Sequence, residues 1–243
     1  GWQGGEPTLM GIPFFQSALL FQKKYKRPGM KIQNSIQTNG TLLNDDWGGF
    51  FHDNHFFLGI SIDGPEEIHD HFRYDKKGRG TFKQVMRGID ICQKYNLEFN
   101  TLTVVQSHNG EHPVKIYDFL KNIGSTFFQF IPIVEHSDNR LMDKPLDGMI
   151  YASEENALES YISVSDYSIG PEQWGYFLNK VFDRWLSKED VGNIFVRDFD
   201  LMLSMVMGLP SSSCVNAKTC GREVALEHNG DLYSCDHYVQ NDY

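Results

Sequence analysis

The sequence has no long apolar run and few basic residues, and both absences limit what the protein can bind. No run approaches the roughly 20 apolar residues of a membrane-spanning helix, and residues 1–9 lack the basic and apolar segments of a secretory signal. Lys and Arg number 22 against 32 Asp and Glu, which gives a net charge of −10. Because acidic residues outnumber basic ones by ten, nucleic acid and anionic membranes are poor candidate partners. We expect a soluble, cytoplasmic protein that binds a small molecule or an extended polypeptide.

Cysteine is also scarce, and its distribution is informative. Three of the four cysteines, Cys214, Cys220 and Cys235, lie within the last 30 residues. Disulfides are uncommon in cytosolic proteins, so such a group indicates ligation of a metal or a cluster before it indicates crosslinking. Cys92 shares a helical face with apolar residues, and we interpret it as a small buried side chain. Neither end of the sequence resembles a natural terminus, so we interpret the chain as part of a longer protein.

Short β-rich segments alternate with helical patterns in the first part of the chain, which is typical of a parallel sheet built from βα units. Four strands are predicted, at Lys31–Thr38, Phe57–Asp63, Glu98–Val105 and Phe127–Pro132. One helix is predicted from Pro13 to Arg27. A second begins after Thr81, its expected N-cap, and a third ends at Gly124. The sequence therefore predicts an α/β fold.

The pattern changes after residue 140. Residues 141–210 show helices without intervening strands, including one that begins at Pro171 and a shorter one at Asp198–Gly208. Beyond them, two short β-rich segments flank Asn229-Gly230, a dipeptide that favours a tight hairpin turn. We predict three parts, covering residues 1–140, 141–210 and 211–243.

Polar residues lie at the ends of the predicted strands, and a glycine motif lies near the start of the chain where a further strand should end. The segments are Gly4-Gly5-Glu6-Pro7, Gln37-Thr38-Asn39-Gly40, Ser61-Ile62-Asp63-Gly64-Pro65 and Gln106-Ser107-His108-Asn109. In a parallel βα barrel, catalytic and binding groups collect at the carboxyl ends of the strands. Paired glycines also let a ligand approach the backbone closely, although a simple glycine turn fixed by Pro7 is the alternative.

The ordered segments resemble the anaerobic sulfatase-maturating family of radical S-adenosylmethionine (SAM) enzymes. The resemblance starts at Gln3, continues through residues 37–40 and 61–65 with Ile68-His69-Asp70 and Arg73, and includes Gly80-Thr81-Phe82. It implies a partial parallel (β/α) barrel of the radical SAM type, followed by a helical bridge and a truncated SPASM cluster domain.

The resemblance also implies a site for S-adenosyl-L-methionine. In such enzymes the glycine motif holds the methionine amino group, which corresponds to Gly4, Gly5 and Glu6 here. A serine and a following arginine lie at the cofactor's ribose and carboxylate, which corresponds to Ser61 and Arg73. The plain alternatives are an ordinary strand residue and a solvated loop charge.

Two further positions follow from the same resemblance. Val134 matches an apolar residue that packs on the adenine, and Gln3 matches a residue that faces the peptide substrate. The alternative for Val134 is ordinary core packing. His69-Asp70-His71 could suggest a metal site, but no third ligand is nearby in the sequence.

The grouped cysteines resemble the start of the SPASM region, which binds auxiliary 4Fe-4S clusters. Thiolates are the usual protein ligands of such clusters, and a closed site normally needs four. The resemblance implies Cys214, Cys220 and Cys235 as ligands, with the fourth beyond the end of the sequence. A zinc knuckle that adds His228 or His237 is the alternative.

Asp236 directly follows Cys235 and matches an acid that is proposed to deprotonate the target residue in this family. The alternative is a hydrogen-bond acceptor that orients the cluster loop. The implied reaction is reductive cleavage of SAM to a 5′-deoxyadenosyl radical, followed by oxidation of a Cys or Ser in a sulfatase peptide to formylglycine. An electron donor such as flavodoxin or ferredoxin is expected as a second partner.

The sequence departs from the family pattern in one respect. The three closely spaced cysteines that bind the catalytic 4Fe-4S cluster are missing, so we expect the chain as written to be inactive and the activity to belong to its parent protein. Two other functions stay open. One is another SPASM peptide modifier, of the thioether-forming or epimerising type, and the other is a zinc-stabilised peptide-binding module.

Overall fold

The computed structural model describes residues 1–135, 164–211, 213–219, 224–236 and 239. The chain divides into two compact units. The first contains Gly1–Val134 and Asp166–Asp198, and the second contains Glu135–Ser165 and Phe199–Tyr243. The sheet and the helices that cover it belong to the first unit, so this unit positions the predicted SAM residues.

The first unit contains a sheet of five parallel strands that are paired in chain order. The strands are β1 (Ser35–Thr38), β2 (Phe57–Ser61), β3 (Phe99–Val105), β4 (Phe127–Pro132) and β5 (Phe195–Val196). Trp2 adds a parallel bridge to β1, since its amide donates to Ser35 O at 2.8 Å and its carbonyl accepts from Gln37 N at 2.9 Å. The predicted parallel sheet is confirmed.

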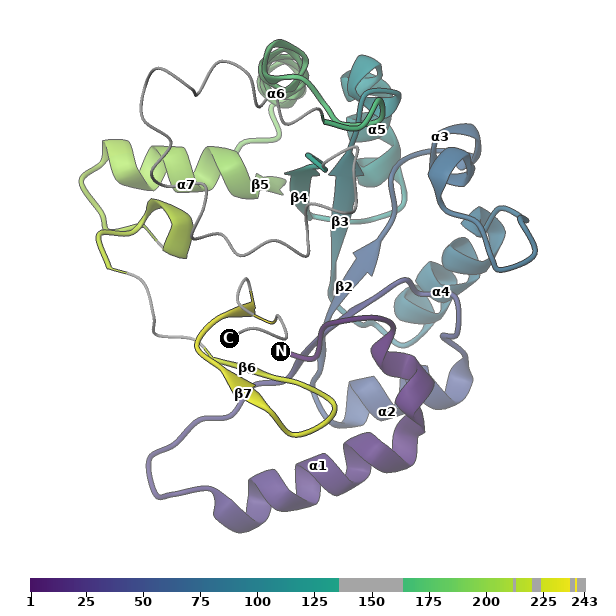
Figure 1. The fold of residues 1–243 in the computed structure, drawn as a ribbon, viewed down its shortest axis with the longest axis vertical. Coiled ribbons are helices and arrows are strands. Elements are labelled where there is room, and N and C mark those ends of the chain that lie inside the picture. The colour runs from purple at the N-terminus through teal and green to yellow at the C-terminus, as the bar shows by residue number, and fades with distance from the viewer. Residues whose placement is uncertain (136–163, 212, 220–223, 237–238, 240–243) are drawn as a thin grey trace, which may run out of the picture. The chain divides into compact units, whose positions relative to one another are not determined.

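Helices alternate with the strands along the first unit (Figure 1). They are α1 (Gly11–Tyr25), α2 (Asp45–Asp53), α3 (Glu66–Phe72), α4 (Phe82–Lys94), α5 (Pro113–Asn122) and α6 (Pro171–Ser187), with short 3₁₀ turns η1 (Pro7–Met10) and η2 (Asn109–Glu111). In Figure 1, α2, α4 and α5 lie on the same side of the strands. The arrangement is the predicted α/β fold, a partial parallel βα barrel.

Alternate residues of each strand face the helices. In β3 the residues at positions 99, 101, 103 and 105 are buried, and those between them are half-buried. On β4, the ring of Phe128 lies 5.4 Å from Tyr117 of α5, and the ring of Phe130 lies 5.1 Å from Phe177 of α6. Aromatic contacts of this kind therefore form the layer between the sheet and α5 and α6.

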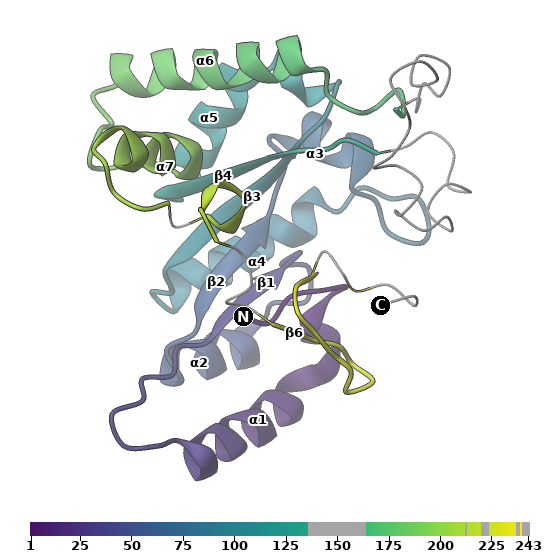
Figure 2. The ribbon, with the colours of Figure 1, turned by 60° about the vertical axis from the view of Figure 1, so that its left-hand side comes forward.

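Helices α5 and α6 lie side by side (Figure 2) and share a polar network at one end. The hydroxyl of Tyr117 donates to Asp190 at 2.6 Å, and Lys121 Nζ lies 2.5 Å from the same carboxylate. Arg184 of α6 donates two hydrogen bonds, of 2.8 and 2.6 Å, to the carboxylate of Asp118 of α5. Burial, followed by the contact with Asp190, raises the pKa of Tyr117, so the phenol stays protonated and donating.

Several elements differ from the sequence prediction. The strand β5 lies within residues 141–210, where no strand was predicted, and it pairs with β4. The helices α2 and α3 were not predicted; Asn44 starts α2, because its side chain accepts from Trp47 N at 3.0 Å. Thr81 precedes α4 as predicted, but its hydroxyl makes no cap. Instead, the carboxylate of Asp70 accepts from Phe82 N at 2.8 Å.

The second unit contains the predicted hairpin. Strands β6 (Ala225–Leu226) and β7 (Leu232–Tyr233) are antiparallel, and Gly230 in the turn has a φ of +94°. This confirms the predicted hairpin, in which Gly230, but not Asn229, has a positive φ. The helix α7 (Arg197–Val206) includes the boundary between the two units. The division of the chain at residues 140 and 210 stays a prediction. Among the described residues, no helix is long and apolar enough to cross a membrane.

Candidate functional site

The glycine motif lies directly after the backbone that pairs with β1. Gly4 and Gly5 have φ values of +102° and +54°, which favour glycine, and no atom lies within 4 Å of a Cβ added at either residue. A larger residue at these positions would strain the backbone, because of the positive φ, but its side chain would not clash with other atoms. The motif therefore presents bare backbone on an open side of the loop, and its predicted contact with a ligand stays a prediction.

Glu6 holds this loop against the end of β1. Its carboxylate accepts from Thr8 N at 3.0 Å, Thr8 Oγ1 at 2.5 Å, Thr38 Oγ1 at 2.7 Å and Asn39 N at 2.7 Å. Hydrogen bonds to a carboxylate are stronger than those between neutral groups. The structure thus connects two of the predicted polar segments, residues 4–7 and 37–40, through one side chain.

Ser61 and Arg73 line the same small pocket, although they are 12 positions apart in the sequence. The pocket has a volume of about 190 Å³, and its walls also include Asn39, Thr41 and Thr81. Ligand pockets for whole cofactors usually exceed about 300 Å³, so this one fits part of a ligand, such as a ribose or a carboxylate. Serine, threonine and asparagine offer donors and acceptors, and Arg73 offers a positive charge.

Ser61 is contacted by a side chain from the neighbouring strand. Gln37 Nε2 donates to Ser61 Oγ at 3.2 Å. The amide of Gln37 lies across Gly59, where an added Cβ would be only 2.0 Å from Gln37 Oε1. Gly59 therefore gives Gln37 the space to reach the hydroxyl at the end of β2.

Arg73 is held by Asp63, a residue of the segment at positions 61–65 for which the sequence predicted no role. Arg73 Nε donates to Asp63 Oδ2 at 2.5 Å, and Arg73 Nη2 donates to Asp63 Oδ1 at 3.0 Å. The Asp63 side chain is 3% exposed and that of Arg73 is 24% exposed. One signal was available in the sequence, since the aspartate stands two positions after Ser61 at the end of a strand.

Other predicted residues are less closely associated with this pocket. Val134 follows β4 by two residues and is 62% exposed, so it is not part of the core, and its contact with adenine stays a prediction. Gln3 is exposed and lines a second pocket of about 190 Å³ together with Gln37, Asn100 and Gln129. The predicted peptide contact of Gln3 stays a prediction.

The predicted cluster ligands and the predicted base belong to the second unit. Cys214 is exposed and begins a short 3₁₀ turn, and Cys235 follows the hairpin. The thiol of Cys235 donates to Asp236 Oδ1 at 3.2 Å, a contact that fits the alternative in which this aspartate orients the cysteine. Cys220 and His237 lie outside the described residues. Within the described part of the chain, no group of three ligating side chains is close enough to hold a metal ion.

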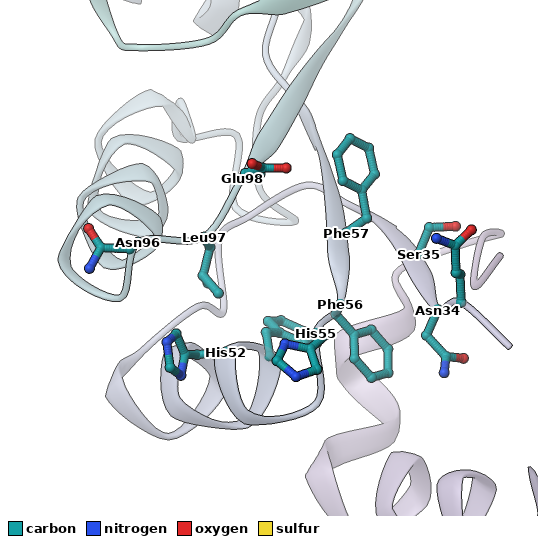
Figure 3. Close-up of a pocket in the computed structure, with 11 residues that line it drawn as sticks. Asn34, Ser35, His52, His55, Phe56, Phe57, Asn96, Leu97 and Glu98 are labelled. Carbon is teal, nitrogen blue, oxygen red and sulfur yellow. The ribbon is translucent and has the colours of Figure 1, made fainter. Parts of the chain in front are cut away.

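A larger pocket opens at the amino ends of the strands (Figure 3). It has a volume of about 680 Å³, and its walls include Asn34, His55, Phe57, Asn96 and Glu98. None of the predicted site residues lies in it. In βα barrels the catalytic groups collect at the opposite, carboxyl end, so the size of this pocket does not make it the functional site.

The chain matches the model of the radical SAM superfamily over residues 1–120. It is 44% identical to a serine-type anaerobic sulfatase-maturating enzyme of Bacteroides thetaiotaomicron, over 100% of this chain and 56% of that protein. It is 38% identical to a cysteine-type enzyme of Clostridium novyi, over 100% of this chain and 59% of the relative. The chain thus spans less than two thirds of the length of these relatives.

A solved structure has the same fold. It is described as native anSMEcpe with bound AdoMet and Cp18Cys peptide, and it matches 99% of this chain and 61% of its own chain at a TM-score of 0.82 and 36% identity. The match includes both units of the chain, so the similarity extends beyond the barrel into the region of the grouped cysteines.

Proposed function

The chain belongs to the radical SAM superfamily, among the anaerobic sulfatase-maturating enzymes, and we propose that the protein containing it oxidises a Cys or Ser side chain of a sulfatase polypeptide to formylglycine. The observation that carries this proposal is the pocket at the carboxyl ends of the strands, which both Ser61 and Arg73 line. It lies beside a glycine loop that Glu6 fixes to β1, as expected for a cofactor held at several strand ends.

The residues present fit SAM. Arg73 carries the charge that complements the cofactor's carboxylate, and the Ser61 hydroxyl can pair with the ribose. The exposed backbone of Gly4 and Gly5 lies open, so its carbonyl groups can accept from the methionine ammonium group. Val134, exposed after β4, supplies an apolar surface for the adenine. When bound, SAM supplies the radical chemistry that removes a hydrogen atom from the target side chain.

The cysteines in the second unit fit an auxiliary 4Fe-4S cluster in their chemistry. Cys214, Cys220 and Cys235 would supply three thiolates. The sequence has four cysteines in all, and the remaining one, Cys92, is buried on α4. The ligands of the catalytic cluster are therefore not among the residues of this chain, and the proposed activity belongs to the complete protein that contains it.

Asp236 is the proposed base for the target side chain. An exposed carboxylate next to a cluster ligand can receive the proton of a Cys thiol or a Ser hydroxyl while the substrate is oxidised. Gln3 is proposed to bind the polypeptide, since its amide both donates and accepts hydrogen bonds. We further propose flavodoxin or ferredoxin as the electron donor and the cytoplasm, where thiols stay reduced, as the location.

The test uses the complete protein, expressed and reconstituted without oxygen. Dithionite, SAM and a sulfatase peptide with either Cys or Ser at the target position are added, and the peptide is followed by mass spectrometry. We expect loss of two hydrogens from the Ser peptide, or the same loss with exchange of sulfur for oxygen in the Cys peptide. Formation of 5′-deoxyadenosine is expected to accompany the product.

Asp236→Ala is expected to abolish the aldehyde, and Asp231→Ala is the matched control because Asp231 is also an exposed carboxylate near the hairpin. Cleavage of SAM without aldehyde would indicate another SPASM peptide modifier. Zinc in place of iron and sulfide would indicate the zinc-stabilised binding module and exclude the radical reaction. The ratio of the two peptide rates decides between a Cys-type and a Ser-type enzyme.

A further inference from the structure

The guanidinium group of Arg73 has one fixed orientation in the pocket. Its Nε and Nη2 atoms both donate to the carboxylate of Asp63, at 2.5 and 3.0 Å. The same carboxylate also accepts from Val104 N at 3.0 Å, which ties it to β3. A bidentate pair fixes the plane of a guanidinium as well as its distance. The Nη1 atom is not used by Asp63 and stays available for a ligand.

The backbone around Arg73 is fixed by a second set of contacts. Thr81 Oγ1 donates to Arg73 O at 3.1 Å, and Thr81 N donates to the same carbonyl at 3.1 Å. His69 Nε2 lies 3.2 Å from Thr81 Oγ1, and His69 Nδ1 accepts from Asp63 N at 3.3 Å. Since the threonine hydroxyl has already donated, His69 donates from Nε2 and accepts at Nδ1, which requires the neutral imidazole.

These contacts connect four residues into one network, in which Arg73 and Thr81 line the pocket and His69 and Asp63 lie buried beside them. His69 is 0% exposed and Asp63 is 2% exposed. Burial of the imidazole lowers the pKa of His69 to about 4, so the ring is neutral at physiological pH, as its two hydrogen bonds require. The network joins the end of β2, which carries Ser61, to the segment after α3, which carries Arg73. It therefore sets the distance between Ser61 and Arg73 in the pocket.

We propose that Asp63 and His69 are positioning residues, which hold Arg73 so that its free Nη1 atom binds the carboxylate of SAM. The inference rests on the proposed function, because it gives Arg73 a cofactor contact. An arginine that is already fixed loses little side-chain freedom on binding, so its contact with the ligand is stronger than that of a mobile arginine. Asp63 binds Arg73 rather than the cofactor, so its effect is on cofactor affinity.

The test measures SAM affinity and SAM cleavage in the complete, reconstituted protein, with and without peptide. Asp63→Asn keeps the size of the side chain but removes the bidentate pair. Asp75→Asn is the matched control, because Asp75 accepts from Arg79 at 2.9 and 2.7 Å on the same segment but outside the pocket. We expect Asp63→Asn to raise the KM for SAM about tenfold, with the KM for peptide unchanged and the control like wild type.

A second pair of variants covers the case in which Asp63→Asn does not fold. His69→Asn keeps an acceptor for Asp63 N but loses the contact with Thr81, and a smaller rise in the KM for SAM is expected. Arg73→Lys keeps the charge but cannot form the bidentate pair. In the Arg73→Lys background, His69→Asn is expected to have no further effect on the KM for SAM, since the fixed orientation is already lost.

Outcomes for the positioning role and for the proposed function are separate. If folded Asp63→Asn and His69→Asn keep a KM for SAM within about twofold of wild type, the positioning role is wrong. Equal rises in the KM for SAM and for peptide, with a lower melting temperature, indicate a purely structural pair and also overturn it. If the wild type cleaves SAM but leaves sulfatase peptides unchanged, the proposed function fails alone. If the wild type does not bind SAM, both fail.

Discussion

Gly88 of α4 packs directly on Gly40, the residue that ends the segment after β1. A Cβ added to Gly88 would be 2.3 Å from Gly40 O, a backbone atom that cannot rotate away. We expect Gly88→Ala to lower the free energy of unfolding by about 2 kcal/mol, because the helix must move off the loop. Urea unfolding followed by tryptophan fluorescence measures this, since all four tryptophans lie in the first unit.

The matched control for Gly88 is Gly175 in α6, where an added Cβ meets nothing within 4 Å. Gly175→Ala is expected to stabilise the protein by about 0.5–1 kcal/mol, since alanine restricts the unfolded chain and favours the helix. If both variants raised the free energy of unfolding by the same amount, the close contact between Gly88 and Gly40 would be contradicted.

The lowered pKa of His69 predicts that the stability of the protein depends on pH. Burial, opposed by the nearby carboxylate of Asp63, lowers its pKa from 6.5 to about 4 in the folded protein. The unfolded protein therefore binds more protons between about pH 4 and 6.5, and stability rises with pH across this window and is level above it. We expect the free energy of unfolding to rise by about 3 kcal/mol across this window. Urea unfolding at several pH values checks this, and His69→Asn is expected to have a smaller slope than wild type.

Cys92 is expected to resist alkylation. It is 0% exposed, and burial raises its pKa to about 12, so roughly one thiol in ten thousand is ionised at pH 8. Iodoacetamide should label it only after unfolding, whereas the exposed Cys214 reacts in the folded, cluster-free chain. Peptide mapping by mass spectrometry separates the two sites. Labelling of both at similar rates would show that α4 opens readily.

Gln37 is expected to support Ser61 in cofactor binding, if the proposed function holds. Gly59→Ala places a methyl group where the Gln37 amide lies, so the contact with Ser61 Oγ is lost. The loss of one neutral hydrogen bond predicts a rise of about two- to tenfold in the KM for SAM. Gly49→Ala on α2 is the control, because its Cβ would meet only the Tyr95 ring, at 3.9 Å. An unchanged KM in both variants argues against a role for Gln37.

Much of the barrel could be predicted from local patterns. The strands β3 and β4 lie where the apolar runs placed them, and Gly4 and Gly5 have the positive φ angles that paired glycines favour. Asn229-Gly230 likewise predicted the hairpin of the second unit. These features depend on residues within a few positions of one another, so their physical cause is visible in the sequence. The two-residue strand β5 was missed because its only signal is the neighbouring strand β4.

The amino-acid sequence by itself determined the alternation of strands and helices and the order of polar segments at the strand ends, from which the family could be recognised. Only the tertiary structure decided how those segments are joined. Arg73 donates to Asp63 and accepts at its carbonyl from the Thr81 hydroxyl. The carboxylate of Asp70, in place of Thr81, caps α4, and His69 is neutral. The physical reason is that propensity acts between near neighbours along the chain. Burial and hydrogen-bond geometry depend on residues that only folding brings together.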